Sequence, residues 1–325
     1  MDEALAHYLV VRAMEERAGV DARTRFALAI RHAVAGHLPH RRYREAAAAR
    51  ARAGAGEGSV ERSVADWVST DLNPLVRSIS SLRSHENALW AYNSYNLSAG
   101  LGARTSVDFV GPRPSSSVRL AKRERLASAE DPELCATGTL VALERALSNV
   151  SRNARRSDTR APGVLEVGRL LGVEQSASFH LAEALAAGGV ADLRETARGL
   201  GSSPRSLQRR LAEEATSFEA VRAAVRIVAA TDMLRGDAPL AEVAWSCGFS
   251  DLPHLARAMK ASCGMTPGLV RAILRGGARP EAELPLTGAG IPGVPWREDS
   301  TDISRVEATI PPEPAKARDF DWRDR

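Results

Sequence analysis

The chain is 325 residues long, which is enough for two domains of ordinary size. Its 44% hydrophobic and 26% charged residues are typical of a soluble globular protein. The 5% aromatic content argues against a large aromatic-rich β-barrel, and a formal net charge of +4 is too small to identify a nucleic-acid partner by itself.

The cysteines and the first residues indicate a cytoplasmic protein. Cys135, Cys247 and Cys263 form no CxxC pair, which is the usage of a reduced, intracellular chain. The start, MDEALAHYL, is acidic and lacks the basic region of a signal peptide. No apolar run is long enough to span a bilayer, so we expect no membrane partner.

The beginning of the chain is predicted to be helical. Within residues 4–36, Phe26, Ile30 and Val34 form an apolar stripe at helical spacing. The segment HRRYR, residues 40–44, then leads into an Ala/Arg run. That run is either a basic arm that touches DNA or a solvated helix end, and we favour the helix end because short charge runs usually face water.

The next two segments have different sequence patterns. Residues 60–84 repeat the helical pattern, with a break or kink expected at Asn73-Pro74 because the residue before a proline avoids the helical conformation. Further on, LWAY at 89–92 and VDFV at 107–110 are aromatic or β-branched runs bounded by glycines, which predicts strands.

Three aromatic residues are the candidate ligand site of the N-terminal half. Trp90, Tyr92 and Tyr95 lie close together in the sequence, among several amide side chains. Aromatic walls with a few polar groups line small-molecule pockets. The alternative, which we favour, is that they form the aromatic core of this region.

Residues 134–150 return to a helical pattern. Their apolar face either pairs with a second subunit or packs inside the same chain (Leu140, Leu143, Leu147 and Val150). The polar, basic segment 151–163 ends in Pro-Gly and predicts a linker. Residues 164–187 then predict two short helices around Gly172.

The first of two helix-turn-helix patterns is LRETARGLGSSPRSLQRRL, residues 193–211. It breaks at a glycine and restarts on a capping serine, either Ser202 or Ser203, followed by a proline where the missing N–H costs nothing. Leu207 and Leu211 are spaced to face the interior. The polar residues between them should therefore face outward.

The second pattern is LAEVAWSCGFSDLPHLARAMK, residues 240–260. It breaks at Gly248 and restarts on Ser250 or Asp251, with Leu255 and Met259 spaced to face the interior. Between the two patterns, residues 217–234 predict an amphipathic helix long enough to set two DNA-reading helices apart.

This region resembles the C-terminal DNA-binding domain of the AraC/XylS family of transcription regulators. The resemblance covers residues 188–275 and rests on these matching residues: Ser203, Arg205, Leu207, Gln208, Arg209, Leu211, Ser217, Phe218, Arg226, Ala230, Leu234, Leu240-Ala241-Glu242-Val243-Ala244, Gly248-Phe249-Ser250-Asp251, Arg257-Ala258, Lys260, Gly264 and Thr266-Pro267. It implies a mainly α fold, in which a double helix-turn-helix domain follows an N-terminal domain that is α+β or mostly helical.

The resemblance also implies which side chains read DNA. Arg205 and Arg209 become candidates for guanine edges or phosphates, and Gln208 for an adenine edge. In the second reading helix Leu252 and a proline replace the polar residues common in the family, which leaves fewer donors. The full set of expected DNA-binding residues is Ser203, Arg205, Ser206, Gln208, Arg209, Ser250, Leu252, His254, Arg257 and Lys260.

One further departure from the family pattern concerns the backbone. Ala215 stands where the family usually has a glycine after the first reading helix. If the backbone there needs a positive φ, an alanine is strained.

These patterns predict four parts: an N-terminal effector or oligomerisation domain at 1–150, a linker at 151–163, the DNA-binding domain at 164–275 with helix-turn-helix units near 190–211 and 240–262, and a disordered tail at 276–325. The predicted function is sequence-specific transcription regulation on promoter DNA, with RNA polymerase and a homodimer through residues 1–150 as further candidate partners. The alternative is a protein-interaction scaffold with weak or non-specific DNA binding. We expect no enzyme, metal or cofactor, because the chain has no zinc-type histidine spacing and no nucleotide-binding glycine motif.

Overall fold

The computed structural model describes residues 5–15, 20–52, 67–99, 101, 103–110, 117–126, 143, 147, 150, 160–188, 192–276, 296–298 and 307–309. The protein is mainly α-helical, as the sequence predicts. Among the helices that the structure describes, none is both long and apolar enough to cross a membrane.

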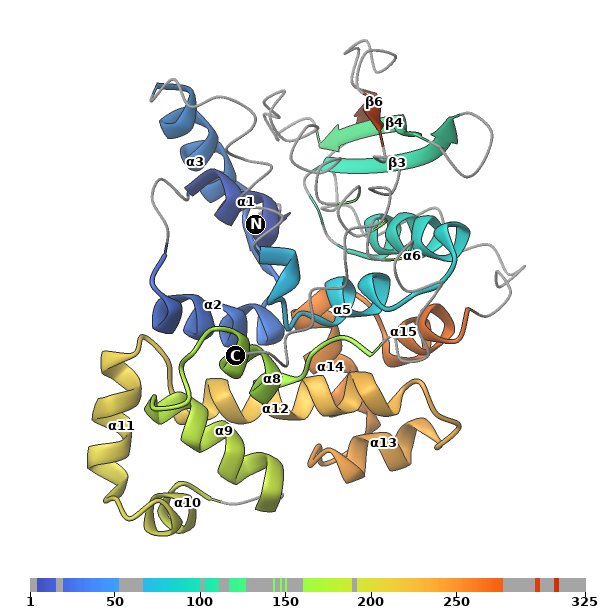
Figure 1. Ribbon diagram of the computed structural model, residues 1–325. Helices are drawn as coiled ribbons and strands as arrows, with labels where there is room; N and C mark the ends of the chain where they lie inside the picture. The colour runs from blue at the N-terminus through green and yellow to red at the C-terminus, as the bar shows by residue number, and fades with distance from the viewer. Residues whose placement is uncertain are drawn as a thin grey trace, which may run out of the picture.

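The N-terminal half combines short helices with two small antiparallel sheets (Figure 1). Strand β1 pairs with β2, and β4 pairs with β3, β5 and β6. In chain order its elements are β1 (Leu5–His7), α1 (Tyr8–Glu15), α2 (Ala22–Val34), β2 (His37–Pro39), α3 (His40–Arg52), α5 (Pro74–Ser80), α6 (His85–Ser98), β3 (Ala103–Val110) and β4 (Ser117–Leu126).

Two sequence predictions for this half have different outcomes. Strand β3 contains residues 107–110, which confirms the strand expected there. The strand expected at 89–92 is wrong, because these residues lie inside α6. Ser84 caps that helix, and Ala88, Ala91 and Tyr95 are buried at helical spacing, so their burial follows a helical period rather than a strand's alternation.

The tail after residue 276 contains two short strands where the sequence predicts disorder. These are β5 (Trp296–Glu298) and β6 (Glu307–Thr309), both antiparallel to β4. The prediction of a wholly disordered tail is therefore wrong at these two places, where pairing with β4 supplies hydrogen-bond partners for the backbone. The remainder of the tail lies outside the described residues.

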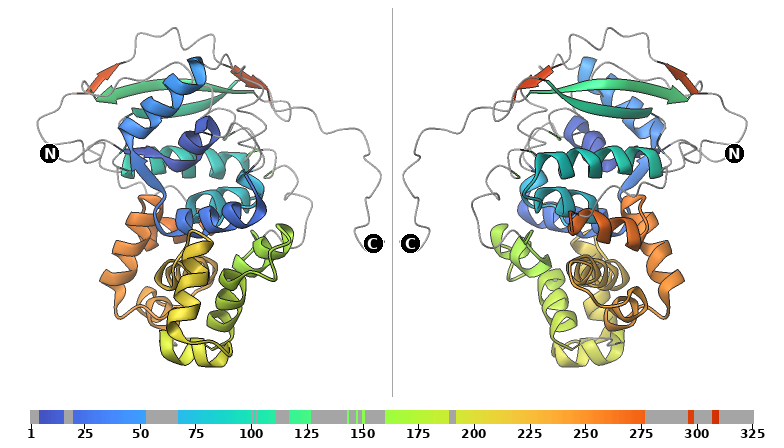
Figure 2. Two further views of the ribbon diagram at one scale, coloured as in Figure 1. Left: turned by 90° about the vertical axis from the view of Figure 1, so that its left-hand side faces the viewer. Right: turned by 90° about the vertical axis from the view of Figure 1, so that its right-hand side faces the viewer.

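The C-terminal part is a bundle of short helices around the long helix α12. Figure 2 shows this bundle at one end of the molecule, with β3 and β4 at the opposite end and the helices of the N-terminal half between them. Its elements are α8 (Val164–Leu170), α9 (Ala177–Gly188), α10 (Leu193–Gly199), α11 (Pro204–Glu213), α12 (Phe218–Met233), α13 (Leu240–Ser246), α14 (Leu252–Cys263) and α15 (Pro267–Leu274).

One hydrophobic core runs from the N-terminal half into this bundle. It includes Phe26 and Ile30 of α2, Leu75 of α5, Leu211 of α11 and Leu255 of α14. Leu143, Leu147 and Val150 are buried in the same core, so these three residues pack inside the chain rather than forming a free face for a second subunit. Leu140 lies outside the described residues.

Candidate nucleic-acid interface

The first helix-turn-helix unit consists of α10 and α11. Asp192 caps α10 by accepting from the Glu195 backbone N–H at 2.8 Å, and Ser203 caps α11 by accepting from Ser206 at 3.1 Å. Gly201 supplies the left-handed turn between the helices, with a φ of +61°. Of the two serines proposed as the cap of α11, Ser203 is therefore the one that caps it.

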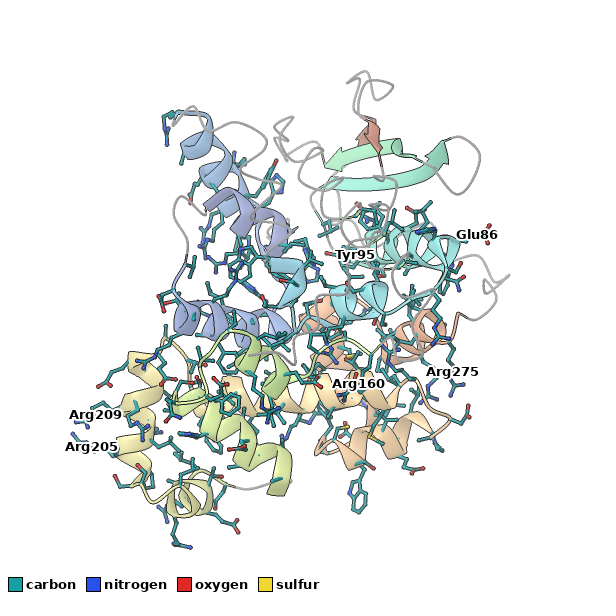
Figure 3. The ribbon with its side chains drawn as sticks, viewed as in Figure 1. Glu86, Tyr95, Arg160, Arg205, Arg209 and Arg275 are labelled. Atoms are coloured by element: carbon teal, nitrogen blue, oxygen red, sulfur yellow. The ribbon has the colours of Figure 1, made fainter. Side chains whose placement is uncertain are left out.

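Helix α11 is anchored on one side and exposed on the other. Leu207 and Leu211 are buried in the core, whereas Arg205, Gln208 and Arg209 are exposed. Figure 3 shows Arg205 and Arg209 projecting from α11 away from the body of the protein. Arg209 also faces Glu213 at 3.7 Å, one helical turn on, but both side chains are largely exposed, so the pair is weak.

The second unit consists of α13 and α14. Asp251 caps α14 by accepting from the His254 backbone N–H at 2.6 Å, and Gly248 makes the left-handed turn with a φ of +77°. Leu255 and Met259 are fully buried, as expected from their spacing. Asp251, rather than Ser250, is therefore the cap of this helix.

The outer face of α14 presents fewer donors than that of α11. Arg257, Lys260 and Ser250 are exposed, but Leu252 is half-buried against the core. The ring of His254 is half-buried, stands edge-on to Phe249 at 5.2 Å and lies 3.2 Å from Ser250 Oγ through Nδ1. His254 is thus partly engaged within the protein, whereas Arg257 and Lys260 are open to a partner.

The first unit is joined to helix α9 by a carboxylate. Glu214, directly after α11, accepts from the backbone N–H groups of Ala177 at 2.7 Å and Ser178 at 2.9 Å. These are orphan donors of the first turn of α9, and a negative charge there also suits the helix dipole. This contact fixes α11 relative to α9.

The end of α14 is held by the N-terminal half. Asn73, fully buried, donates through Nδ2 to the carbonyls of His32 and Ser262, each at 2.8 Å. Gly36 donates its backbone N–H to Ala261 at 3.3 Å. Because these bonds join α2, α5 and α14, the second unit is built into the N-terminal half.

A buried arginine ties the N-terminal half to α12 as well. Arg77 of α5 is 1% exposed and pairs with Asp232 of α12 at 2.8 Å, while its other terminal nitrogen donates to the Pro162 carbonyl. Burial lowers the pKa of the Arg77 guanidinium, and the charge of Asp232 opposes that effect. Sequence inspection gave no signal for this pair, because its partners are far apart in the chain.

The three aromatic residues of the candidate ligand site all lie on α6. Tyr95 is buried and its hydroxyl lies 3.0 Å from His37 Nε2, whereas Trp90 and Tyr92 are half-buried against the core. This placement agrees with an aromatic core. A ligand-binding role for these three residues stays a prediction.

The two described cysteines are buried. Burial raises the pKa of the Cys247 thiol to about 11 and that of Cys263 to about 12. Both thiols are therefore protonated near neutral pH and act as small hydrophobic groups. Within the described ranges, no group of three or more His, Cys, Asp or Glu side chains is arranged to hold a metal ion.

Comparison with known proteins identifies the C-terminal region. Residues 196–273 match a family model described as a helix-turn-helix domain. They form an AraC-type helix-turn-helix domain, which is a DNA-binding module of transcription regulators. The match contains most of α10 and all of α11 to α14, the elements that make up both units described above.

The other comparisons add less. No curated protein matches the sequence. Among solved structures, the crystal structure of transcriptional regulator CdpR from Pseudomonas aeruginosa matches at 16% identity and a TM-score of 0.29, with 79% of this chain and 99% of that chain covered. A TM-score this low carries no argument about fold or function.

Proposed function

We propose that this DNA-binding chain recognises specific promoter sequences through α11 and α14, each placed in one of two adjacent major-groove segments. The observation that carries the proposal is the outward face of α11. Two guanidinium groups and an amide stand exposed on a helix whose opposite side is fixed by two buried leucines. Such donors match the guanine and adenine edges of the major groove, and they also pair with phosphates.

The two helices contribute unequally in this proposal. Arg205, Gln208 and Arg209 on α11 provide the sequence discrimination, with Ser203 and Ser206 at the start of the helix near the phosphates. On α14, Arg257 and Lys260 hold the DNA backbone, Leu252 meets a thymine methyl group, and Ser250 and His254 add polar contacts. The half-buried Leu252 and the engaged ring of His254 support the smaller share given to α14.

Residues 1–150 are assigned a regulatory role, either sensing an effector or forming a homodimer, with RNA polymerase as the partner of the DNA-bound protein. In this proposal they are the N-terminal domain, followed by the linker at 151–163 and the DNA-binding domain 164–275, and they share one hydrophobic core with that domain. The hydrogen bonds from Asn73 and Gly36 to α14 support the role, because a change in the N-terminal half then reaches the second unit directly.

A gel-shift experiment tests the proposal on fragments selected for binding to the full-length protein. The double variant Arg205→Ala/Arg209→Ala is expected to lose the specific shift while keeping the wild-type circular dichroism spectrum. Loss of one bidentate guanine contact costs about 1–3 kcal/mol, so two lost contacts weaken specific binding about a hundredfold or more.

The matched control is Arg41→Ala/Arg44→Ala, which removes two exposed arginines from α3. We expect it to bind like the wild type. Full affinity in the α11 variant would refute the assignment, and a loss confined to the α3 variant would favour the basic arm instead.

A second candidate function is a protein-interaction scaffold, favoured by the sparse donors on α14. A scaffold does not release counterions from DNA, so its interactions do not show the steep salt dependence of phosphate contacts.

A further inference from the structure

A cavity of about 430 Å³ lies along α12, between α8 and α9 and the end of α13. Val225, Ala229 and Asp232 of α12 form part of its floor. Residues of α8 and α9 line one side, and Ser246, Cys247 and Gly248 at the end of α13 line the other. The volume lies within the range of small-molecule sites, roughly 300–1,000 Å³.

The lining of this cavity is largely apolar, with a charged rim. Its aliphatic side chains come from the three helices α8, α9 and α12 (Val164, Leu165, Ala182, Leu185, Ala186, Val225, Val228, Ala229). The rim carries four arginines and two carboxylates (Arg160, Arg169, Arg222, Arg226, Glu166, Asp232). The cavity therefore suits a molecule with an apolar body and a negative charge.

The charges of the rim do not balance. Arg160 contacts both carboxylates, Glu166 at 2.8 Å and Asp232 at 3.9 Å. Arg222 pairs with Glu219, outside the cavity. Among the described residues, Arg169 and Arg226 have no carboxylate partner, and the guanidinium of Arg169 lies over the Phe179 ring at 5.8 Å.

Arg226 is the more informative of these two cations because it is half-buried. Burial lowers its pKa and the nearby charge of Arg222 lowers it further, whereas the charge of Glu219 acts in the opposite sense. Glu219 forms its ion pair with Arg222, and within the described ranges no ion pair is formed by Arg226 itself. A partly buried charge that is incompletely compensated is costly, and an anion placed beside it removes part of that cost.

We propose that this cavity binds a small apolar carboxylate, whose carboxylate group pairs with Arg226 while its apolar body lies along Val225 and Ala229. Such a ligand touches the floor helix and both flanking walls at once. It therefore biases the relative placement of α9 and α13, and so of the two units. A change in their placement changes the affinity for DNA. This effect on DNA rests on the proposed function, whereas the binding of the carboxylate does not.

Calorimetric titration of the full-length protein without DNA tests the binding. The probe is 2-naphthoate, and 2-naphthamide is its uncharged counterpart. We expect saturable binding of 2-naphthoate, and binding of 2-naphthamide weaker by about tenfold or more, because a charge-assisted pair contributes roughly twice a neutral hydrogen bond.

Three variants locate the site. Arg226→Gln is expected to weaken 2-naphthoate about tenfold or more, again through the lost charge-assisted pair. Ala229→Trp fills the cavity from an exposed helix position and should abolish binding. Arg198→Gln, on the exposed face of α10, is the matched control and should bind like the wild type.

Several results would overturn the proposal: no saturable binding of 2-naphthoate up to about 1 mM, equal affinity for naphthoate and naphthamide, or unchanged affinity in a folded Arg226→Gln protein. If Arg226→Gln does not fold, full binding by Ala229→Trp overturns it instead. A gel shift with and without 2-naphthoate then tests the effect on DNA. If the proposed function fails, the protein gives no specific shift even without 2-naphthoate. If only the regulation fails, the shift is the same with and without 2-naphthoate.

Discussion

Ala215 is strained in a way that the sequence already indicated. It is the one non-glycine residue of the described ranges with a positive φ, +54°, and it follows the cap of α11. A left-handed alanine costs roughly 1–2 kcal/mol relative to the usual backbone conformation, whereas glycine avoids that cost but loses more entropy on folding. The position is therefore expected to favour glycine.

Ala215→Gly should raise the free energy of unfolding by about 0.5–1 kcal/mol, measured by denaturant titration. The matched control is Ala212→Gly, three residues earlier on the exposed face of α11, which should lower it by up to about 1 kcal/mol. Equal destabilisation by both substitutions would show that the backbone at 215 carries no strain.

Three histidines are held without charge near the junction of β1, β2 and α2. Burial lowers the pKa of His7 to about 3, that of His32 to about 2 and that of His37 to about 4. Burial of Asp71 acts in the opposite sense, raising its pKa to about 7. The net effect of pH on stability depends on how many protons the unfolded and the folded chain each bind at that pH.

Stability should fall when the pH is lowered from 7.5 to 5.0. The histidines of the unfolded chain take up protons near pH 6.5 while the folded ones do not, so their contribution to stability is complete above that pH and is lost below it. Asp71 offsets part of the loss, because between pH 7 and pH 5 only its folded form takes up a proton. His37→Gln should reduce the loss by on the order of 2 kcal/mol. His180→Gln, on α9, serves as control, and an identical pH profile for both variants would contradict the prediction.

At the scale of single elements, the link between α11 and α9 depends on one carboxylate. Glu214→Gln weakens the two backbone hydrogen bonds to Ala177 and Ser178 and removes a charge from the start of α9. Capping and helix-dipole terms together give an expected loss of about 1 kcal/mol in unfolding free energy. Thermal unfolding of the variant measures it.

The neighbouring Glu213→Gln is the natural comparison. Glu213 is exposed and only faces Arg209 one turn away, so its loss should change stability by less than about 0.5 kcal/mol. If the two variants melt together, Glu214 does not act as a cap.

The elements that could be predicted from the sequence are those with local signals. Short-range chemistry narrows each cap to two neighbouring residues, of which Ser203 and Asp251 are the caps, and it also predicts the glycine breaks and the buried leucines of both units. The strand predicted at 89–92 is part of helix α6. Aromatic residues favour strands, but Ala88, Ala91 and Tyr95 are spaced at a helical period. In this segment the helical periodicity is the stronger signal, and the strand propensity of aromatic residues is the weaker one.

At the scale of the whole molecule, contacts between distant segments could not be predicted. Asn73 looked only like a helix break, yet its side chain joins α2 to the end of α14. The Arg77–Asp232 pair and the cavity beside Arg226 likewise combine residues far apart in the chain. No local pattern encodes such pairs, because each partner alone has an ordinary sequence environment.

The close approach of the N-terminal half to α14 gives a prediction at this scale. A Cβ on Gly36 would overlap the Ser262 carbonyl oxygen and Asn73 Nδ2. Gly36→Ala should therefore lower the unfolding free energy by about 2 kcal/mol or more, since backbone atoms cannot move aside cheaply.

Gly199→Ala is the matched control, because a Cβ there meets nothing within 4 Å. It should be neutral or slightly stabilising. Both are measured by denaturant titration, and a Gly36→Ala protein as stable as the control would mean that α14 is not tightly docked.

The most direct test of the central claim is the salt dependence of DNA binding by the full-length protein and by Arg205→Ala/Arg209→Ala. If α11 presents its arginines to DNA, the logarithm of the binding constant falls steeply with the logarithm of salt concentration. The double variant should then have a slope shallower by about one for each arginine that contacts a phosphate. Identical slopes with unchanged affinity, or a wild-type protein whose binding ignores salt, would contradict the account.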